Sequence, residues 1–292
     1  MSSSSSERVK GKVENFILAA ACSRSVVGQP FQNLERMESL VRRAAAQGAG
    51  LVLLPEAGLT GYANGSLAAE AGLDLESGPV RAVVGLAQEV GVDLSVGLIE
   101  RAEPKRSYLS QLLIGKEGRI LARYRKLHLG PTETDRFEAG KEVGLVERGY
   151  ARLGFQLCFD AHFPELATVQ ALAGAELILA PHASPRKESP EEKRDRWLRY
   201  LPARAYDNTL FLAACNQVGD NGQGWFFAGV ALILGPKGEV LASYTGSGPG
   251  LALARIEAGS LNRIRESRMG FFRASRRPEL YRPVSVGKDK GL

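Results

Sequence analysis

The chain has 292 residues, of which 44% are hydrophobic and 24% are charged, and its formal net charge is +6. A chain of this length and composition can bury a large core and form one or two globular domains. Its basic residues are mixed with acids, which argues against a nucleic-acid-binding protein, and it has no run of about 18 apolar residues that could cross a membrane.

The three cysteines, Cys22, Cys158 and Cys215, form no pair with CxxC spacing, and their odd number gives no disulfide framework. Residues 1–12 (MSSSSSERVKGK) are rich in serine and charge, and we expect them to be disordered. The apolar stretch that follows is too short for a signal peptide and is better explained as a strand. These features predict a cytoplasmic protein with free thiols, in which Cys22 and Cys215 lie in the core.

A short apolar strand followed by an amphipathic helix is the pattern that recurs along the chain. In the first half we expect strands at 16–23, 50–58 and 93–100, helices at 33–48 and 79–91, and a hairpin at 111–126. In the second half we expect strands at 151–160, 176–184, 209–219 and 250–257, helices at 162–175, 189–208 and 259–269, and a hairpin at 229–244. Hairpins among alternating strands and helices predict an α/β fold with mixed sheets, and residues 13–292 are expected to form a single domain with a C-terminal extension.

Three polar residues, Glu56, Lys126 and Cys158, interrupt apolar runs at the carboxyl ends of expected strands, where sites form in α/β sheets. Taken singly, Glu56 could cap a turn, Lys126 could extend to solvent, and Cys158 could fill the core. Taken together, they suit thiol chemistry. A carboxylate can take the proton of a thiol, and a lysine can stabilise the oxyanion that forms when the sulfur attacks a carbonyl carbon.

The segments around these residues resemble the three signature blocks of the carbon–nitrogen hydrolase (nitrilase) superfamily. The blocks are LVLLPEAGLTGY, YRKLHLGPTETDRFEAG and GFQLCFDAHFPELATVQALAGAELILAPHASP, in that order. ARAYDNTLFLAACNQVG and GPKGEVLA are similar to later family segments, so the resemblance runs from about residue 14 to residue 282. It implies an α-β-β-α sandwich with two mixed sheets. Family members usually pair into homodimers through the helices after the nucleophile and through the C-terminal segment.

The resemblance also implies a Glu–Lys–Cys triad. Glu56 would be the general base, Lys126 the oxyanion stabiliser and Cys158 the nucleophile, and the backbone N–H of Phe159 would complete the oxyanion site. No metal or other cofactor is implied. The three histidines lie far apart and lack the spacing of zinc ligands, so we expect no metal site.

A second glutamate often follows the lysine of the family and helps to position the substrate or the lysine. Glu133 matches it best, because ETDRFEAG fits the family's pattern, and Glu138 is the alternative. Other residues are expected to support the triad or to line the substrate pocket. They are His128, Asp160, His162, Arg204 and Asn216.

The residues after Cys158 favour an amidase. Nitrilases usually have Cys-Trp-Glu, whereas this chain has Cys158-Phe159-Asp160, which is similar to the amidase and carbamoylase branches. The N-carbamoyl-D-amino-acid hydrolases carry paired arginines shortly after the cysteine, which would bind a substrate carboxylate. Ala161 and His162 occupy those positions here, which weakens the case for an acidic substrate of this type and favours a neutral or cationic one.

We therefore expect a hydrolase that cleaves a non-peptide carbon–nitrogen bond of a small linear amide or N-carbamoyl compound. The reaction would pass through a covalent acyl-enzyme, which water releases. Two alternatives stay open: a nitrilase acting on a nitrile, and a catalytically idle member that serves as a binding or scaffold subunit. The presence of all three triad residues argues against the idle member.

Overall fold

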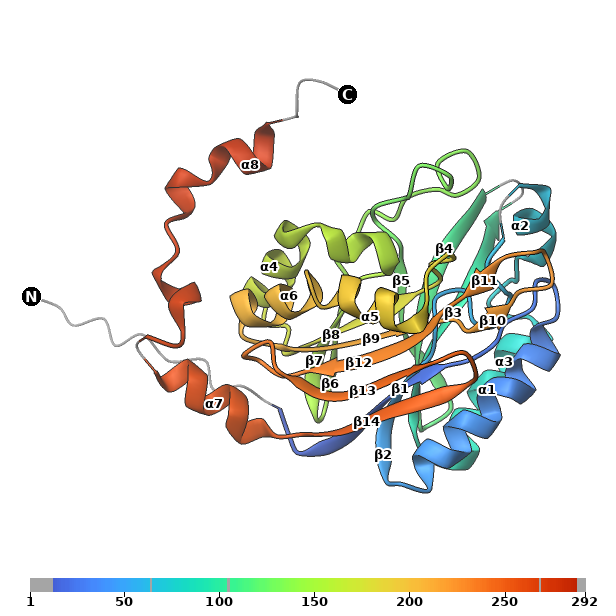
Figure 1. The fold of residues 1–292 in the computed structure, drawn as a ribbon, viewed down its shortest axis with the longest axis horizontal. Coiled ribbons are helices and arrows are strands. Elements are labelled where there is room, and N and C mark those ends of the chain that lie inside the picture. Colours follow the sequence, from blue (N-terminus) through green and yellow to red (C-terminus); the bar gives the residue numbers. More distant parts are fainter. Residues whose placement is uncertain (1–12, 64, 104–105, 268, 288–292) are drawn as a thin grey trace, which may run out of the picture.

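The computed structural model describes residues 13–63, 65–103, 106–267 and 269–287 (Figure 1). Most of this part of the chain belongs to two six-stranded sheets and the helices that cover them. The expected disordered segment, residues 1–12, lies outside the described residues. The assignment of residues 13–292 to one domain stays a prediction.

The first sheet has the strand order β14-β1-β2-β3-β4-β5. Its strands are β1 (Phe16–Cys22), β2 (Ala49–Leu53), β3 (Asp93–Glu103), β4 (Arg106–Gly115), β5 (Arg119–Arg125) and β14 (Gly250–Ile256). β2 runs parallel to β1 and β3, whereas β4, β5 and β14 pair antiparallel to their neighbours. The helices α1 (Pro30–Ala45) and α3 (Gly78–Val90) pack together beside this sheet, with their apolar sides buried against it.

The second sheet has the strand order β13-β12-β9-β8-β7-β6. Its strands are β6 (Leu145–Arg148), β7 (Ala151–Phe155), β8 (Leu177–His182), β9 (Phe211–Asn216), β12 (Gly229–Leu234) and β13 (Val240–Gly246). β7, β8 and β9 are parallel, and the outer pairs are antiparallel. Its helices are α4 (Pro164–Leu172), α5 (Pro190–Trp197) and α6 (Leu201–Asn208).

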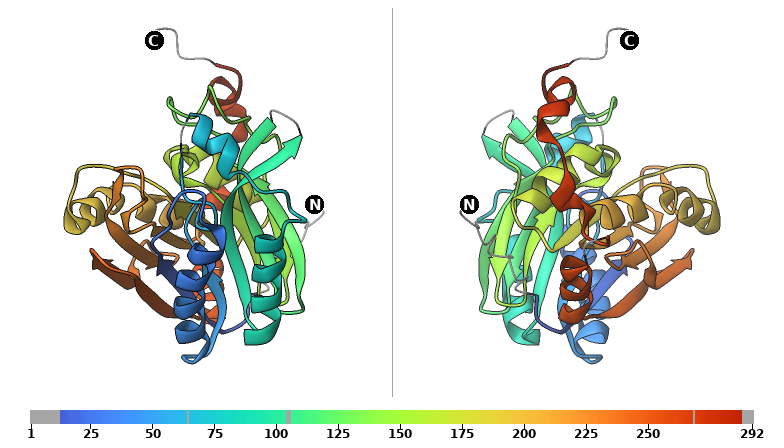
Figure 2. Two further views of the ribbon diagram at one scale, coloured as in Figure 1. Left: turned by 90° about the vertical axis from the view of Figure 1, so that its right-hand side faces the viewer. Right: turned by 90° about the vertical axis from the view of Figure 1, so that its left-hand side faces the viewer.

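Alternation of apolar side chains within the strands produces four layers. One face of each sheet contributes to a shared core that includes Leu18, Leu53, Leu179 and Ala213, so the two sheets pack face to face. The opposite faces pack against α1 and α3 on one side and against α4, α5 and α6 on the other. Figure 2 shows the two groups of helices flanking the paired sheets. The expected α-β-β-α sandwich with two mixed sheets is confirmed.

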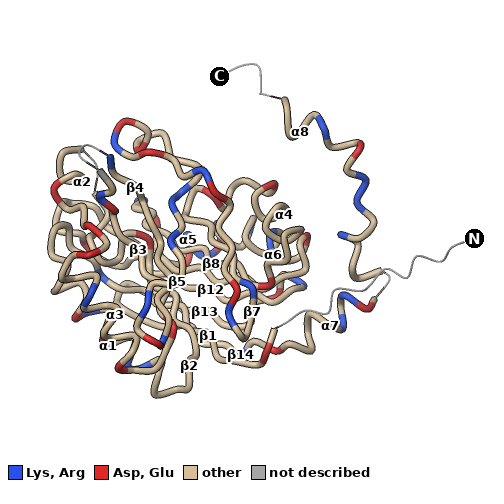
Figure 3. Tube along the Cα trace, turned by 180° about the vertical axis from the view of Figure 1, so that it is seen from behind, with Lys and Arg blue, Asp and Glu red and all other residues tan. Residues whose placement is uncertain are grey.

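Several smaller elements complete the described residues. They are α2 (Ser66–Ala71), the 3-10 turn η1 (Cys158–His162), the short strands β10 (Gly219–Asp220) and β11 (Phe226–Phe227), α7 (Ala258–Glu266), the 3-10 turns η2 (Phe272–Ser275) and η3 (Pro278–Leu280), and α8 (Arg282–Val286). Residues 269–287, called here the C-terminal arm, lead away from the sandwich (Figure 1). Basic and acidic residues are interspersed along the described part of the trace (Figure 3). None of the described helices is long and apolar enough to cross a membrane.

Three expected elements end early or divide in the structure, and the bounds of the others shift by a few residues. The strand expected at 50–58 ends at Leu53, and the strand expected at 151–160 ends at Phe155. In the second case the carboxylate of Asp160 accepts a hydrogen bond from the Leu157 N–H, which turns the chain. The helix expected at 189–208 divides into α5 and α6, because Pro202 has no N–H to donate to the helix turn before it.

Candidate active site

Glu56 lies in the turn after β2 and is fully buried. Its Oε1 accepts a hydrogen bond from Lys126 Nζ at 2.9 Å, and its Oε2 accepts one from the Ala183 N–H at 2.8 Å. Its backbone carbonyl accepts a third from Gln217 Nε2 at 2.8 Å. Since Ala183 and Gln217 follow strands of the second sheet, Glu56 is held at the place where the carboxyl ends of both sheets meet.

Lys126 directly follows β5, and only 1% of the residue is exposed. Besides Glu56, its Nζ contacts Glu133 Oε1 at 2.8 Å. Glu133 is itself held in place, because its Oε1 accepts from Tyr62 Oη at 2.7 Å and its Oε2 accepts from the Gly130 N–H at 2.6 Å. A buried ammonium is costly unless it is paired, and here two buried carboxylates share it.

Of the two candidate glutamates, the structure brings Glu133 to Lys126. Glu138 lies beside β4 instead, where its Oε2 accepts from Tyr108 Oη at 3.0 Å and its N–H donates to the Ser107 carbonyl at 2.9 Å. The position of Glu133 fits the second glutamate that the sequence implies. Its role in catalysis stays a prediction.

Cys158 opens the turn η1 just after β7, so the cysteine follows the strand and does not end it. Its φ of 47° lies in the left-handed region that side chains rarely adopt, and such strain is common where a reactive group is presented. Cys158 is half-buried, whereas Cys22 and Cys215 are buried completely. The expectation that these two cysteines lie in the core is confirmed.

The electrostatics of the site favour a neutral thiol at rest. Burial, and after it the negative charge of Glu56, raise the pKa of Cys158 to about 12, although Lys126 opposes this. Burial also raises the pKa of Glu56, against the attraction of Lys126. A carboxylate with a raised pKa is a better base than an ordinary one, so Glu56 is suited to take the proton that Cys158 must lose.

The charge of Lys126 is stable in this setting. Burial alone would lower the pKa of its ammonium, but the negative charges around it, that of Glu56 first, outweigh burial and place the pKa above its ordinary value. Lys126 therefore stays protonated and remains a hydrogen-bond donor. That is the state in which it can stabilise a developing oxyanion.

Asp160 joins the loop after Lys126 to the turn that carries Cys158. The carboxylate is fully buried and accepts hydrogen bonds from Tyr124 Oη at 2.8 Å and from the Leu157 N–H at 3.0 Å. It also binds the N–H and the Nδ1 of His128, both at 2.8 Å. His128 stacks on Phe163 with ring centroids 3.8 Å apart. Asp160 and His128 therefore hold the turn that carries Cys158 against the loop that follows Lys126.

Arg204 and Asn216 also act on the backbone of neighbouring segments. Arg204 donates from Nε to the Ala161 carbonyl at 3.0 Å and from Nη2 to the His162 carbonyl at 3.2 Å, which holds the end of η1. Asn216 Oδ1 accepts from the Ser184 N–H at 2.9 Å, next to the Ala183 N–H that binds Glu56. The exposed ring of His162 stacks on Tyr200 with centroids 4.5 Å apart. For Phe159, which is half-buried, the oxyanion role stays a prediction.

Sequence reasoning missed several groups of this site. Tyr62 falls in the same block as Glu56 but resembles an ordinary core aromatic, and Gln217 lies in a strand-end segment. Ala183 contributes only its N–H, which no sequence pattern marks. Nothing in the sequence marks Lys193, in the helix expected at 189–208, as a buried cation, yet it is fully buried and its Nζ donates to the Ser184 carbonyl at 2.9 Å.

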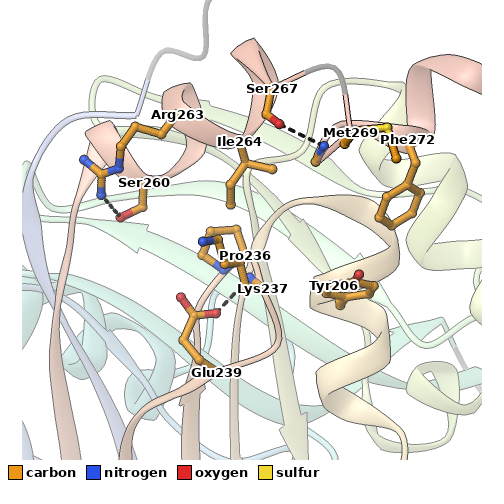
Figure 4. Close-up of a pocket in the computed structure, with 11 residues that line it drawn as sticks. Tyr206, Pro236, Lys237, Glu239, Ser260, Arg263, Ile264, Ser267, Met269 and Phe272 are labelled. Carbon is orange, nitrogen blue, oxygen red and sulfur yellow. Dashed lines mark hydrogen bonds between the residues drawn. The ribbon is translucent and has the colours of Figure 1, made fainter.

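The cavities among the described residues include the following two. One of about 570 Å³ is lined by residues that include Tyr62, Glu188 and Trp225, and Tyr62 links it through Glu133 to Lys126. The other, of about 440 Å³, lies between α7 and α6 (Figure 4). Neither lining includes a triad residue, but only the first cavity is linked to Lys126, through Tyr62 and Glu133, so the first one is the candidate substrate pocket. In the described ranges no cluster of three or more His, Cys, Asp or Glu is arranged to hold a metal ion.

Residues 18–266 match the sequence model of one family, described as carbon-nitrogen hydrolase. The chain belongs to this family. This carbon–nitrogen hydrolase is also similar in sequence to two amidases. The chloroplastic omega-amidase of Arabidopsis thaliana is 30% identical over 278 residues, covering 91% of this chain and 73% of the relative. The 2-oxoglutaramate amidase of Bacillus subtilis is 31% identical over 245 residues, covering 82% of this chain and 90% of the relative.

Solved structures agree with this assignment. A mutant of the amidase from Nesterenkonia sp. AN1, with the acetamide moiety of fluoroacetamide added covalently at its active-site cysteine, has a TM-score of 0.78 and 27% identity, covering 94% of this chain and 97% of that one. The expected membership of the amidase branch is confirmed. This carbon–nitrogen hydrolase is an enzyme that acts on carbon–nitrogen bonds other than peptide bonds.

Proposed function

We propose that this carbon–nitrogen hydrolase cleaves a small linear amide or N-carbamoyl compound with Glu56, Lys126 and Cys158. The observation that carries the proposal is the position of Lys126 Nζ, which lies 2.9 Å from Glu56 Oε1 and 2.8 Å from Glu133 Oε1 where the two sheets meet. Relatives named as amidases, and the cysteine adduct of the amidase from Nesterenkonia sp. AN1, support amide hydrolysis through a thiol.

In the first half-reaction Glu56 takes the proton from Cys158, and the sulfur forms a bond to the carbonyl carbon of the amide. The π electrons of the carbonyl move to its oxygen, where Lys126 Nζ and the N–H of Phe159 donate hydrogen bonds. When the tetrahedral intermediate collapses, the carbon–nitrogen bond breaks. The leaving nitrogen takes the proton from Glu56 and departs as ammonia or an amine, and a thioester remains.

In the second half-reaction Glu56 takes a proton from water, and the water oxygen attacks the thioester carbon. The carbon–sulfur bond breaks as the oxyanion collapses, and the carboxylic acid product leaves. The proton held by Glu56 returns to Cys158, which restores the resting thiol. Glu133 does not exchange a proton in this scheme, and it keeps Lys126 aimed at the oxyanion.

An ammonia-release assay tests this proposal. The panel contains amides, carbamoyl amines, carbamoyl acids and nitriles, and the enzyme is compared with Cys158→Ala. Because Cys158 forms the covalent bond, its removal should lower kcat by at least about 1000-fold. Cys215→Ala, which removes a buried thiol outside the triad, is the control and should keep its activity. Turnover of nitriles alone would show a nitrilase, and full activity of Cys158→Ala would refute the triad.

We further propose that two copies of the chain pair through the C-terminal arm. The arm exposes apolar residues to solvent, which is unfavourable in a monomer. The exposed fraction is 89% for Met269, 70% for Val286, 60% for Val284 and 56% for Leu280. We also propose a cytoplasmic enzyme, because a reducing compartment keeps the free thiol of Cys158 available.

A further inference from the structure

Lys193 is a buried cation near the site that the proposed mechanism does not use. It lies on α5, where it and Trp197, one turn later, are the two buried residues of the helix. The exposed fraction of Lys193 is 0%, and the residue does not line the candidate substrate pocket. A buried ammonium costs free energy unless its charge and its N–H groups are matched. The partners of Lys193 therefore indicate which part of the protein it stabilises.

The ammonium of Lys193 binds the segment that follows β8. Its Nζ donates to the Ser184 carbonyl at 2.9 Å and lies 3.4 Å from Ser184 Oγ. It also pairs with Glu188 Oε1 at 2.7 Å. Lys193 thus ties together the two ends of segment 184–188, and residues 185–188 of this segment line the candidate substrate pocket.

The start of the same segment holds the general base. Ala183, directly before Ser184, donates its N–H to Glu56 Oε2 at 2.8 Å, and the Ser184 N–H donates to Asn216 Oδ1 at 2.9 Å. The Ser184 backbone is therefore held on one side by Asn216 and on the other by Lys193. Because peptide units are planar and rigid, fixing Ser184 also fixes the direction of the preceding Ala183 N–H.

The ion pair of Lys193 belongs to a cluster with a surplus positive charge. Arg196 donates to both oxygens of Glu188, at 2.6 Å and 3.0 Å. Burial would raise the pKa of Glu188, but the hydrogen bonds from Arg196 and Lys193 outweigh it and lower the pKa to about 2. Glu188 is thus ionised and carries one negative charge against two positive ones. It also stays paired with Arg196 if Lys193 is replaced.

This positive charge lies within electrostatic reach of the nucleophile. Burial, and then the charge of Glu56, raise the pKa of Cys158, whereas the charges of Lys126 and Lys193 oppose the shift. The effect is mutual. Burial lowers the pKa of Lys193, and besides Glu188 a negative charge on Cys158 opposes that shift.

The other titratable groups near Lys193 hold their charge states around neutral pH. Burial lowers the pKa of His182 well below its ordinary value, so its ring is neutral. The hydrogen bond to Glu188 raises the pKa of Arg196, which stays a cation. Changes of reactivity with pH near neutrality therefore report on the catalytic groups and not on this cluster.

We propose that Lys193 is a positioning residue of the active site. Its hydrogen bond to the Ser184 carbonyl holds the Ala183 N–H on Glu56, and its charge favours the thiolate that Cys158 becomes during attack. Lys193 acts through Ser184 and does not touch the substrate. The inference rests on the proposed function, in which Glu56 is the general base.

Lys193→Met tests this role, because it keeps the length of the side chain and removes its charge and its N–H groups. Burial raises the pKa of Glu56, and the Ala183 N–H is among the contacts that lower it. Loosening that contact should raise the pKa further. Since Glu56 must be ionised to accept the thiol proton, the acid limb of kcat/KM should move to higher pH by about half a unit, and kcat should fall about 10-fold.

Iodoacetamide labelling of Cys158 gives a second readout that needs no substrate. Loss of a cation that favours the thiolate should move the labelling profile of Lys193→Met to higher pH by about half a unit. Lys193→Gln also lacks the charge but keeps an N–H donor for the Ser184 carbonyl. It should show the same labelling shift and a smaller shift of the acid limb.

The matched control is Lys141→Met, which removes an exposed lysine outside the pocket and should leave both profiles unchanged. Thermal melting of each variant measures its stability. A variant of Lys193 that melts at lower temperature but keeps both wild-type profiles would show a purely structural role and overturn the proposal. So would a labelling profile that stays in place, or an equal shift of the acid limb in Lys193→Met and Lys193→Gln.

Failure of the proposed function gives a different result. Absence of turnover by the wild-type enzyme with every amide would contradict the amidase proposal. The labelling profiles would still show whether Lys193 acts on Cys158.

Discussion

At the residue scale, the site is a balance of charges around one thiol. Two carboxylates, Glu56 and Glu133, share the ammonium of Lys126, so the group carries a surplus negative charge while Cys158 is neutral. That surplus disfavours a resting thiolate and favours removal of the thiol proton by Glu56 when substrate is present. The arrangement therefore favours a neutral thiol at Cys158 at rest.

This balance predicts an unusual effect of Glu56→Gln. Because Glu56 raises the pKa of Cys158, removing its charge should lower that pKa, and the pH profile of iodoacetamide labelling should move by about one unit or more toward lower pH. The same variant should lose amide turnover, since the base is gone. Mass spectrometry identifies the labelled residue, which should be Cys158 in preference to the buried Cys22 and Cys215.

Glu35→Gln, which removes an exposed carboxylate on α1, is the control and should leave the labelling profile in place. A profile of Glu56→Gln at higher pH than that of the wild type would show that Glu56 promotes alkylation mainly as a base. Equal labelling of all three cysteines would contradict an activated thiol.

At the element scale, the nucleophile turn depends on one side chain. Asp160 joins η1 to β5 through Tyr124 and to the segment after β5 through His128, so it holds Cys158 in place relative to Lys126. Strand ends alone would not do this, because both segments leave their sheets before the reactive residues. The turn and the loop form one rigid unit through a buried carboxylate.

Asp160→Asn should therefore lower kcat by on the order of 10- to 100-fold while KM changes little. An amide keeps the volume but places an NH₂ group against donors, and misplacing reacting groups by a fraction of an ångström to 1 Å costs rate in this range. Steady-state kinetics on the best amide measures the effect, and thermal melting separates loss of positioning from loss of folding. Asp195→Asn, an exposed acid on α5, is the control. A change in KM alone would contradict a positioning role.

At the scale of the whole molecule, the C-terminal arm is the feature that the sandwich does not explain. Met269, Leu280, Val284 and Val286 of the arm expose 56% to 89% of their surface, and a second copy could bury them. Burial of apolar area contributes roughly 25 cal/mol per Å², so several such side chains together can stabilise an interface.

Val284→Asp/Val286→Asp should therefore shift the enzyme from dimer toward monomer, because each charge would have to be buried on pairing. Sedimentation velocity at several concentrations measures the shift. Val143→Asp/Val240→Asp changes two exposed valines elsewhere and should keep the dimer. A wild-type enzyme that sediments as a monomer at all concentrations would refute the proposed pairing.

Much of the fold, and the three residues of the triad, could be predicted from the sequence. The alternation of apolar strands and amphipathic helices depends on local periodicity, so the order of elements could be predicted, and so could the α-β-β-α sandwich once the three blocks were compared with the family. Predictions failed where a single contact ends an element. The helix at 189–208 is interrupted between Trp197 and Leu201, ahead of Pro202, and the strand at 151–160 stops before Leu157, whose N–H donates to Asp160.

By itself, the sequence determined which residue types were available: a thiol at Cys158, a carboxylate at Glu56 and an ammonium at Lys126. The family resemblance favoured Glu133 over Glu138, and the tertiary structure brings Glu133 to Lys126. Tertiary structure alone decided that Lys193 is buried beside Glu188. These contacts join segments from different strands and loops, and their geometry depends on how two sheets pack. Local pattern cannot encode that packing, because burial and charge pairing are properties of the assembled core.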